Sequence, residues 1–227
     1  MGRLVQAKGI RLGIQNNWKF GSSFDLNCSY NKLELQKYLV NICNSFYLKN
    51  SVSKVLLILF DEAIVKVSKD VIEVDIHLYD ADYIDELPNV DEELFNNRLI
   101  LLESMIINFV STLYQKPCKI NFVYLDNGKF TANLIIQYIE VKFLQGFNLG
   151  EITGSLQRSL KDVRGLQGYR IDLSGRFTRK QRASHYSFKA GSVPFSKLSS
   201  NIDYSEGHVI LKYGKCGLKV WLNYGVN

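Results

Sequence analysis

The 227-residue sequence lacks the patterns that mark metal-binding, secreted and membrane-spanning proteins. Its four cysteines form no C-x-x-C pair and have no histidine at a metal-ligand spacing, so neither a zinc site nor a disulfide framework is predicted. The longest purely apolar run, VLLILF at 55–60, is far shorter than the roughly 18 residues that a membrane-spanning helix needs. The N-terminus has no apolar core of a secretory signal. We therefore expect a soluble protein without a membrane partner.

Signs of catalysis are equally scarce. The three histidines, His77, His185 and His208, lie on separate predicted strands, and no serine or cysteine stands in a recognisable nucleophile motif. The sequence also has no glycine-rich loop of the kind that cradles a phosphate. We therefore expect neither an enzyme nor a bound cofactor.

Charge is distributed unevenly along the chain. The net charge is +6, yet residues 80–97 hold seven acids and no base, which leaves +13 for the rest of the chain. The first 24 residues contain four bases and no acid, and residues 158–227 contain thirteen bases against four acids. This distribution indicates an anionic partner, with nucleic acid as the first candidate, that meets the two ends of the chain.

The first half of the sequence predicts a small α+β unit. Residues 32–48 carry an apolar stripe at helical spacing, and two or three strands follow through residue 80. Helical spacing returns over 98–115, and a strand over 119–125 leads to the Asn127-Gly128 turn. This order favours helices on one face of a sheet.

The second half predicts two helices followed by four strands. Helical spacing covers 132–147 and 149–163, and Arg158, Lys161 and Arg164 lie opposite the apolar stripe of the second helix. Alternating strands are predicted at 169–175, 184–190, 207–214 and 217–224. The connection after the first of them holds four cations: Arg176, Arg179, Lys180 and Arg182. Such a connection buries little, so a phosphate backbone is its expected partner, with a merely solvated loop as the alternative.

Five ordered segments carry a resemblance to a known family. They are GIRLGIQNNW (9–18), LSGRF (173–177), AGSVPFSKL (190–198), IDY (202–204) and YGKCGLKVWL (213–222). They resemble the signature segments of ribosomal protein S3, a protein of the small-subunit head. The resemblance implies an α+β fold of two units, a degenerate type II KH domain and a C-terminal α/β domain with two helices on a mostly antiparallel four-stranded sheet. We accordingly expect a basic N-terminal segment at 1–30, a KH-like domain at 31–126 and a C-terminal ribosomal domain at 127–227.

The resemblance also implies a function. It points to a structural constituent of the small ribosomal subunit that binds rRNA in the head, near the channel through which mRNA enters. Neighbouring head proteins, and mRNA at that channel, are the further implied partners. The residues expected to bind rRNA are Lys8, Arg11, Trp18, Lys19, Arg158, Lys161, Arg164, Arg170, Arg176, Arg179, Lys180, Arg182 and Lys189. For Trp18 the alternative is packing against its own loop, whereas Trp221 is expected to pack against its domain. The rival function is a free-standing RNA-binding protein outside the ribosome.

Two places depart from the family pattern. Where a KH domain has its G-x-x-G loop, this sequence has DELPNVDEE, with no glycine and five acids, so the unit is predicted to have lost its RNA grip. The acids expected to contact proteins instead are Asp80, Asp82, Asp85, Glu86 and Asp91, and a metal site on the first three is the alternative. In the helix after Phe147, Glu151, Ile152 and Ser155 replace the bases that face mRNA in bacterial members, so mRNA unwinding is not predicted.

The sequence composition favours an organelle. Asn, Lys, Ile, Phe and Tyr are abundant, as in the products of AT-rich genomes, and the lost RNA contacts suit a mitochondrial ribosome. We therefore expect a mitochondrial ribosomal protein. Because little sequence precedes GIRLGI, such a protein is expected to be encoded within the organelle; a plastid or a bacterial cytoplasm is the alternative location.

Overall fold

The computed structural model describes residues 6–14, 34, 38–39, 58–67, 71–80, 92–124, 130–161 and 163–225. The chain divides into two compact units, one formed by Lys19–Asp126 and the other by Asn127–Asn227 together with Met1–Trp18. The N-terminal segment therefore groups with the C-terminal unit. Among the described helices, none is long and apolar enough to cross a membrane.

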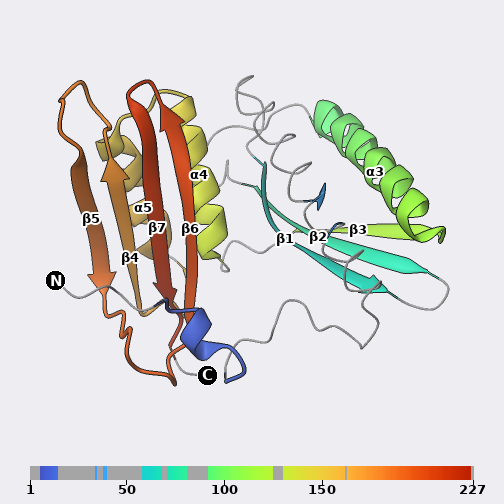
Figure 1. The fold of residues 1–227 in the computed structure, drawn as a ribbon, viewed down its shortest axis with the longest axis horizontal. Coiled ribbons are helices and arrows are strands. Elements are labelled where there is room, and N and C mark those ends of the chain that lie inside the picture. Colours follow the sequence, from blue (N-terminus) through green and yellow to red (C-terminus); the bar gives the residue numbers. More distant parts are fainter. Residues whose placement is uncertain are drawn as a thin grey trace. The chain divides into compact units, whose positions relative to one another are not determined.

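The Lys19–Asp126 unit contains a three-stranded sheet in the order β1-β2-β3. Its elements are β1 (Ile58–Val67), β2 (Ile72–Asp80), α3 (Glu92–Tyr114) and β3 (Cys118–Tyr124). β1 and β2 are antiparallel, whereas β2 and β3 are parallel and are joined by α3, because a parallel pair needs a crossover connection (Figure 1). The sequence thus predicts these strands and this helix correctly, although α3 begins six residues earlier than its apolar pattern. Of the helix expected at 32–48, the described residues Glu34, Tyr38 and Leu39 are helical.

The core of this unit follows the two expected periodicities. Alternate residues of β2 are buried, from Ile72 to Leu78. On α3 the buried residues Leu99, Leu102, Ile106 and Val110 recur every three or four positions, which places them on one face of the helix. The sheet and the helix therefore bury one face each.

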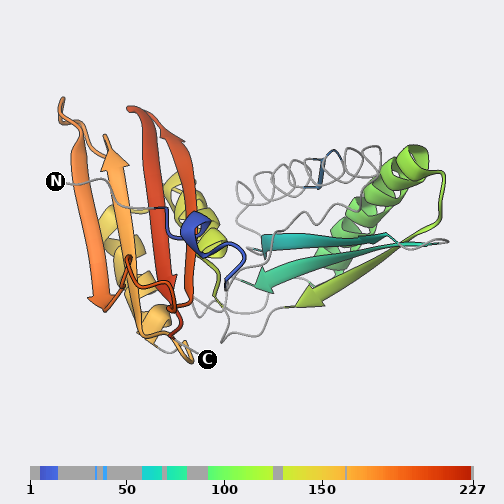
Figure 2. The same cartoon turned by 60° about the horizontal axis from the view of Figure 1, so that its bottom comes forward.

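The C-terminal unit is two helices on a four-stranded antiparallel sheet, as expected (Figures 1 and 2). Its elements are α4 (Ala132–Leu144), α5 (Leu149–Lys161), β4 (Gly168–Gly175), β5 (Ser184–Gly191), β6 (Ile202–Leu211) and β7 (Gly214–Asn223). The strand order is β5-β4-β7-β6. α4 begins after Thr131, whose side-chain oxygen accepts a hydrogen bond from the backbone N–H of Leu134 at 3.3 Å, an N-cap that the first turn of a helix needs.

Strand β6 is longer than the sequence pattern predicts. The alternation suggested a start at Gly207, but the strand starts at Ile202. A Cβ atom at Gly207 would lie 2.6 Å from Cγ2 of Ile136, so α4 packs directly onto the strand at this residue. The glycine therefore marks a close approach of helix and sheet inside the strand, and not the turn that it suggests in the sequence.

Candidate nucleic-acid interface

The N-terminal segment lies on the face of the C-terminal sheet that α4 and α5 leave free (Figure 2). Ala7 is fully buried there in a cluster with Ile202 and Trp221, against which Val193 and Phe195 also pack. Trp221 is only 3% exposed, so the prediction that it packs against its domain is confirmed. The segment 6–14 is thus part of the fold of this unit.

Arg11, which lies in the 3-10 helix η1 (Gly9–Arg11), is fully buried on this face. Its Nε donates to the carbonyl oxygen of Ser200 at 2.9 Å, its Nη1 to that of Ala7 at 2.8 Å, and its Nη2 to that of Lys197 at 2.6 Å. Burial lowers the pKa of the guanidinium, and the carbonyl dipoles around it compensate the buried charge. The prediction that Arg11 contacts rRNA does not fit this burial. In this structure, Arg11 ties the N-terminal segment to the loop at 194–200.

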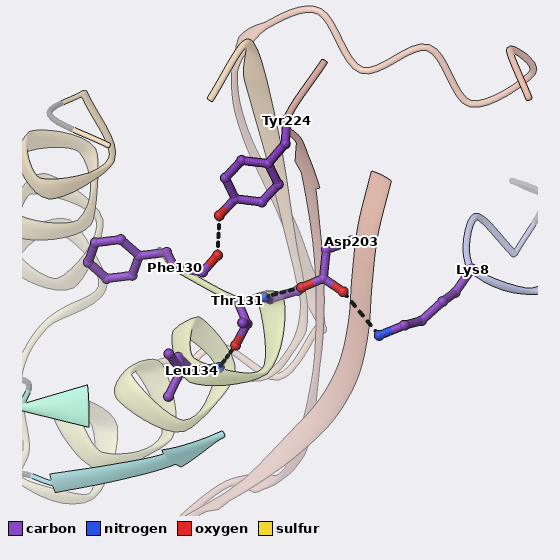
Figure 3. Close-up of polar contacts among 7 residues, drawn as sticks. Lys8, Phe130, Thr131, Leu134, Asp203 and Tyr224 are labelled. Carbon is purple, nitrogen blue, oxygen red and sulfur yellow. Dashed lines mark hydrogen bonds and ion pairs between the residues drawn. The ribbon is translucent and has the colours of Figure 1, made fainter. Parts of the chain in front are cut away.

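Lys8 forms a second contact between the N-terminal segment and β6 (Figure 3). Its Nζ forms an ion pair with Oδ1 of Asp203 on β6 at 3.0 Å, and the other carboxylate oxygen accepts a hydrogen bond from the backbone N–H of Ala132 at 2.7 Å. Next to it, the Tyr224 hydroxyl donates to the carbonyl oxygen of Phe130. Asp203 therefore holds the N-terminal segment and the start of α4 together. Lys8 keeps 36% of its side-chain surface exposed, so this tie leaves it partly accessible to a ligand.

Arg170 on β4 is also committed to the fold. Its Nη2 lies 2.8 Å from Oδ2 of Asp172, and its Nε contacts both oxygens of the same carboxylate at 3.0 and 3.1 Å. Its guanidinium covers the rings of Phe195 and Trp221, at 5.8 and 5.6 Å from their centroids. An arginine that is paired and stacked in this way is less available to bind a phosphate. Lys189, which faces Arg170 across the β4–β5 pair, is exposed.

The other cations of the sheet gather at one of its ends. Because β4 and β7 are antiparallel, the β4–β5 connection and the β6–β7 turn lie at the same end of the sheet. We call this region the basic end; it consists of Arg176, Arg179, Lys180, Arg182, Lys212 and Lys215. No acid occurs in the segments 173–191 and 207–217 that form it. Lys212 and Lys215 were missed by the sequence analysis, since only the strand register brings them beside the β4–β5 connection.

The cations of α5 form a separate group. Arg158 and Lys161 lie exposed in the last turn of α5, and Arg164 lies exposed in the turn that leads to Gly168. β4 runs from Gly168 to the basic end over eight residues, a length of roughly 23 Å. The two groups of cations are therefore at opposite ends of the strand, and the structure does not merge them into one patch.

Several predicted site residues lie outside the described part of the chain. They are Trp18, Lys19, Asp82, Asp85, Glu86 and Asp91. Asp80 ends β2, but its side chain is not among the described ones. Contacts of these residues with rRNA or proteins, and the alternative metal site, stay predictions.

Comparison with known proteins finds a family whose model matches the C-terminal unit. The model of the family described as "Ribosomal protein S3, C-terminal domain" matches residues 148–222, from the start of α5 to the end of β7. Small ribosomal subunit protein uS3m of Acanthamoeba castellanii is 38% identical over 112 residues, which are 47% of this chain and 37% of that protein. Two relatives align along nearly the whole chain. Protein uS3 of Elm witches'-broom phytoplasma is 24% identical over 99% of this chain and 84% of its own length. Protein uS3c of Euglena longa is 26% identical over 98% of this chain and its entire length.

These matches agree with the geometry of the C-terminal unit. The matched range contains α5 and extends through the four strands to the last residue but one of β7. All six cations of the basic end lie inside this range. Together, the family match over the C-terminal unit and the relatives that bear this name support a divergent member of the ribosomal protein S3 family.

Proposed function

We propose that this small-subunit ribosomal protein binds small-subunit rRNA through the basic end of its C-terminal unit. The observation that carries the proposal is the composition of that end, which joins six cations from two separate connections without an acid. Neutralising phosphates with Lys and Arg releases the counterions of the nucleic acid, so such a surface favours RNA of any sequence. Phosphate contacts of this kind fix the position of a protein on its RNA.

The availability of these side chains supports the proposal. Arg179, Lys180, Arg182, Lys212 and Lys215 are all exposed. None of them forms an ion pair with another described residue, in contrast to Lys8 and Arg170. A cation that is not paired within the protein breaks no ion pair when it binds a phosphate. The exposed cations Lys189, Arg158, Lys161 and Arg164 are candidates for a second RNA contact, with rRNA or with mRNA near its channel.

The proposed location is a mitochondrial ribosome. The supporting observation is the 38% identity to a relative whose name marks it as the mitochondrial protein, within a segment that covers about half of this chain. Neighbouring proteins of the small-subunit head are the proposed partners of the acidic residues 80–93. A degenerate KH-like fold for the Lys19–Asp126 unit is part of the same proposal, supported by its three-stranded sheet with one parallel pair.

Sedimentation of ribosomes from cells that express a tagged chain tests the rRNA contact. We expect the wild-type chain to co-sediment with the small subunit and to resist a high-salt wash. The variant Arg179→Gln/Lys180→Gln/Arg182→Gln should dissociate at lower salt, because it loses phosphate contacts and the counterion release that strengthens binding. Each lost contact should also make the fall of log K with log salt less steep by about 0.7–0.9. The matched control, Arg158→Gln/Lys161→Gln/Arg164→Gln, removes the same charge from the other end of the strand.

The control separates specific loss from a general loss of charge. A greater loss of association in the basic-end variant than in the α5 variant supports the basic end as the main rRNA contact, whereas unchanged association of the basic-end variant would contradict it. Slow sedimentation of the wild-type chain with many unrelated RNAs would favour the free-standing RNA-binding protein instead.

A further inference from the structure

Arg176 differs from the other cations of the basic end in what its side chain contacts. It is half-buried, and its Nε donates to the carbonyl oxygen of Lys180 at 2.6 Å. Its Nη2 donates to the carbonyl oxygen of Arg179 at 3.0 Å. The guanidinium carbon also lies 5.2 Å from the centroid of the Tyr213 ring, in the β6–β7 turn. One side chain thus closes the β4–β5 connection on itself and attaches it to the neighbouring hairpin.

The backbone at Gly175 and Arg176 is held in place by Cys216 on β7. Gly175 has φ +149°, and a Cβ atom there would lie 2.6 Å from Sγ and 2.8 Å from Cα of Cys216 on β7. The thiol of Cys216 donates a weak hydrogen bond to the carbonyl oxygen of Arg176 at 3.5 Å. The start of the connection is therefore fixed against β7, so the direction in which the Arg176 side chain leaves the strand is defined by the sheet.

Holding the connection in place matters for binding. Arg179, Lys180 and Arg182 are long side chains on an exposed connection, and ordering such a segment on binding costs conformational entropy. A connection that is already closed by Arg176 loses less entropy when it meets an RNA. It also keeps these three cations beside Lys212 and Lys215, so that they act as one surface.

We propose that Arg176 is a positioning residue for RNA binding, which acts through the Tyr213 ring and the carbonyl groups of Arg179 and Lys180, and that Arg179, Lys180 and Arg182 make the phosphate contacts. This inference rests on the proposed function of the basic end. It assigns Tyr213 to the interface, although no motif in the sequence indicates a role for that residue. Lysine cannot take the place of Arg176, because an ammonium group has neither the planar fork that reaches two carbonyl groups nor a face that stacks on a ring.

Substitutions that keep the charge test this role in the full-length chain. The affinity for small-subunit rRNA, purified from the source ribosomes, is measured by filter binding over a range of salt. We expect Arg176→Lys to weaken binding on the order of tenfold, the loss that follows from one charge-assisted hydrogen bond. The matched variant Arg179→Lys should weaken binding less than Arg176→Lys, because a phosphate contact requires mainly the charge. Unchanged affinity of Arg176→Lys would show that Arg176 acts as a phosphate ligand and would overturn the inference.

The ring gives a second, charge-neutral pair of variants. Tyr213→Ser should weaken binding as Arg176→Lys does, while Tyr213→Phe retains the ring and should bind like the wild type. Because both substitutions break the same contact, the variant Arg176→Lys/Tyr213→Ser should be no weaker than either single variant. Additive losses would mean that the two residues act independently, and they would overturn the inference.

Limited digestion with trypsin measures the connection without RNA. Trypsin cleaves after Arg179, Lys180 and Arg182. If Tyr213→Ser frees the β4–β5 connection from the Tyr213 ring, cleavage at these sites should be faster than in Tyr213→Phe. The unfolding midpoint of each variant shows whether the fold is kept. If Arg179→Gln/Lys180→Gln/Arg182→Gln binds rRNA like the wild type, the proposed function fails, while the digestion still reports on the contact of Arg176 with Tyr213. Equal cleavage in both Tyr213 variants overturns the inference even if the basic end binds RNA.

Discussion

Arginine residues of this protein have opposite roles that depend on what surrounds them. Arg11 is fully buried among carbonyl oxygens, and Arg170 is paired with Asp172 and stacked on two aromatic rings. Arg179 and Arg182 are exposed and form no ion pair with the described residues. The same guanidinium therefore stabilises the fold at two positions and is available to a ligand at two others. Removal of a buried arginine and removal of an exposed one should consequently affect different measurements.

Arg11→Met should destabilise the C-terminal unit. The substitution keeps an apolar side chain but leaves the carbonyl oxygens of Ala7 and Ser200 without the donors that Arg11 supplies, and an unsatisfied buried polar group costs about 1–3 kcal/mol. We expect a decrease of that size in the free energy of unfolding, measured by urea denaturation. Lys197→Met is the control, since the side chain of Lys197 is exposed and only its carbonyl group takes part. An equal decrease in both variants would show that Arg11 is not the tie.

At the scale of elements, the contact between α4 and the sheet explains the sequence of β6. Asp203 binds the backbone of α4 at its start, and Gly207 lets the middle of the helix approach the strand. Between them, these two residues of one strand set how α4 lies on the sheet. The glycine is required by the helix that covers it, since its own backbone has no left-handed conformation.

Gly207→Ala should displace α4, because its Cβ would lie 2.6 Å from Cγ2 of Ile136. Overpacking of a core in this way costs about 1–3 kcal/mol of unfolding free energy. Ile136→Ala removes the clashing methyl group and leaves a cavity of its own. In the double variant, the two losses should therefore be less than additive by about 0.5–3 kcal/mol. Strict additivity in urea denaturation would contradict the close approach of helix and strand.

At the scale of the whole molecule, the chain consists of two units that each bury a core of their own. Each unit contains one described cysteine in a covered position, Cys118 at the start of β3 and Cys216 on β7. Burial raises the pKa of both thiols above the ordinary value. Since the thiolate is the reactive form, both cysteines should react with alkylating reagents slowly in the folded state. They therefore serve as separate reporters of the two units.

Pulse alkylation in increasing urea, followed by mass spectrometry of the two cysteine peptides, should give a midpoint for each unit. We expect Arg11→Met to lower the midpoint at Cys216 and to leave the midpoint at Cys118 unchanged, because Arg11 contacts only the C-terminal unit among the described residues. A parallel shift at both cysteines would mean that the two units unfold as one cooperative body.

Much of the fold could be predicted from local sequence. The strands β2, β4, β5 and β7 alternate with period two, and α3, α4 and α5 have apolar stripes at helical spacing. Their places along the chain were therefore predicted, within six residues at the start of α3 and within three residues elsewhere. The start of β6 was wrong because Gly207 resembles a turn residue, and only the packed helix explains it. The N-terminal segment was expected to be separate, since no local pattern indicates that it lies on a sheet formed by residues more than 150 positions away.

The sequence by itself determined the class of fold, the sign of the charge at the two ends of the chain and the family resemblance, because periodicity, charge and short motifs are local properties. Only the tertiary structure decided which cations remain available to a ligand. It buried Arg11, paired Lys8 and Arg170 with carboxylates, and placed Lys212 and Lys215 beside the β4–β5 connection. The physical reason is that the availability of a charge depends on burial and on partners distant in sequence, and these are set by strand register and packing.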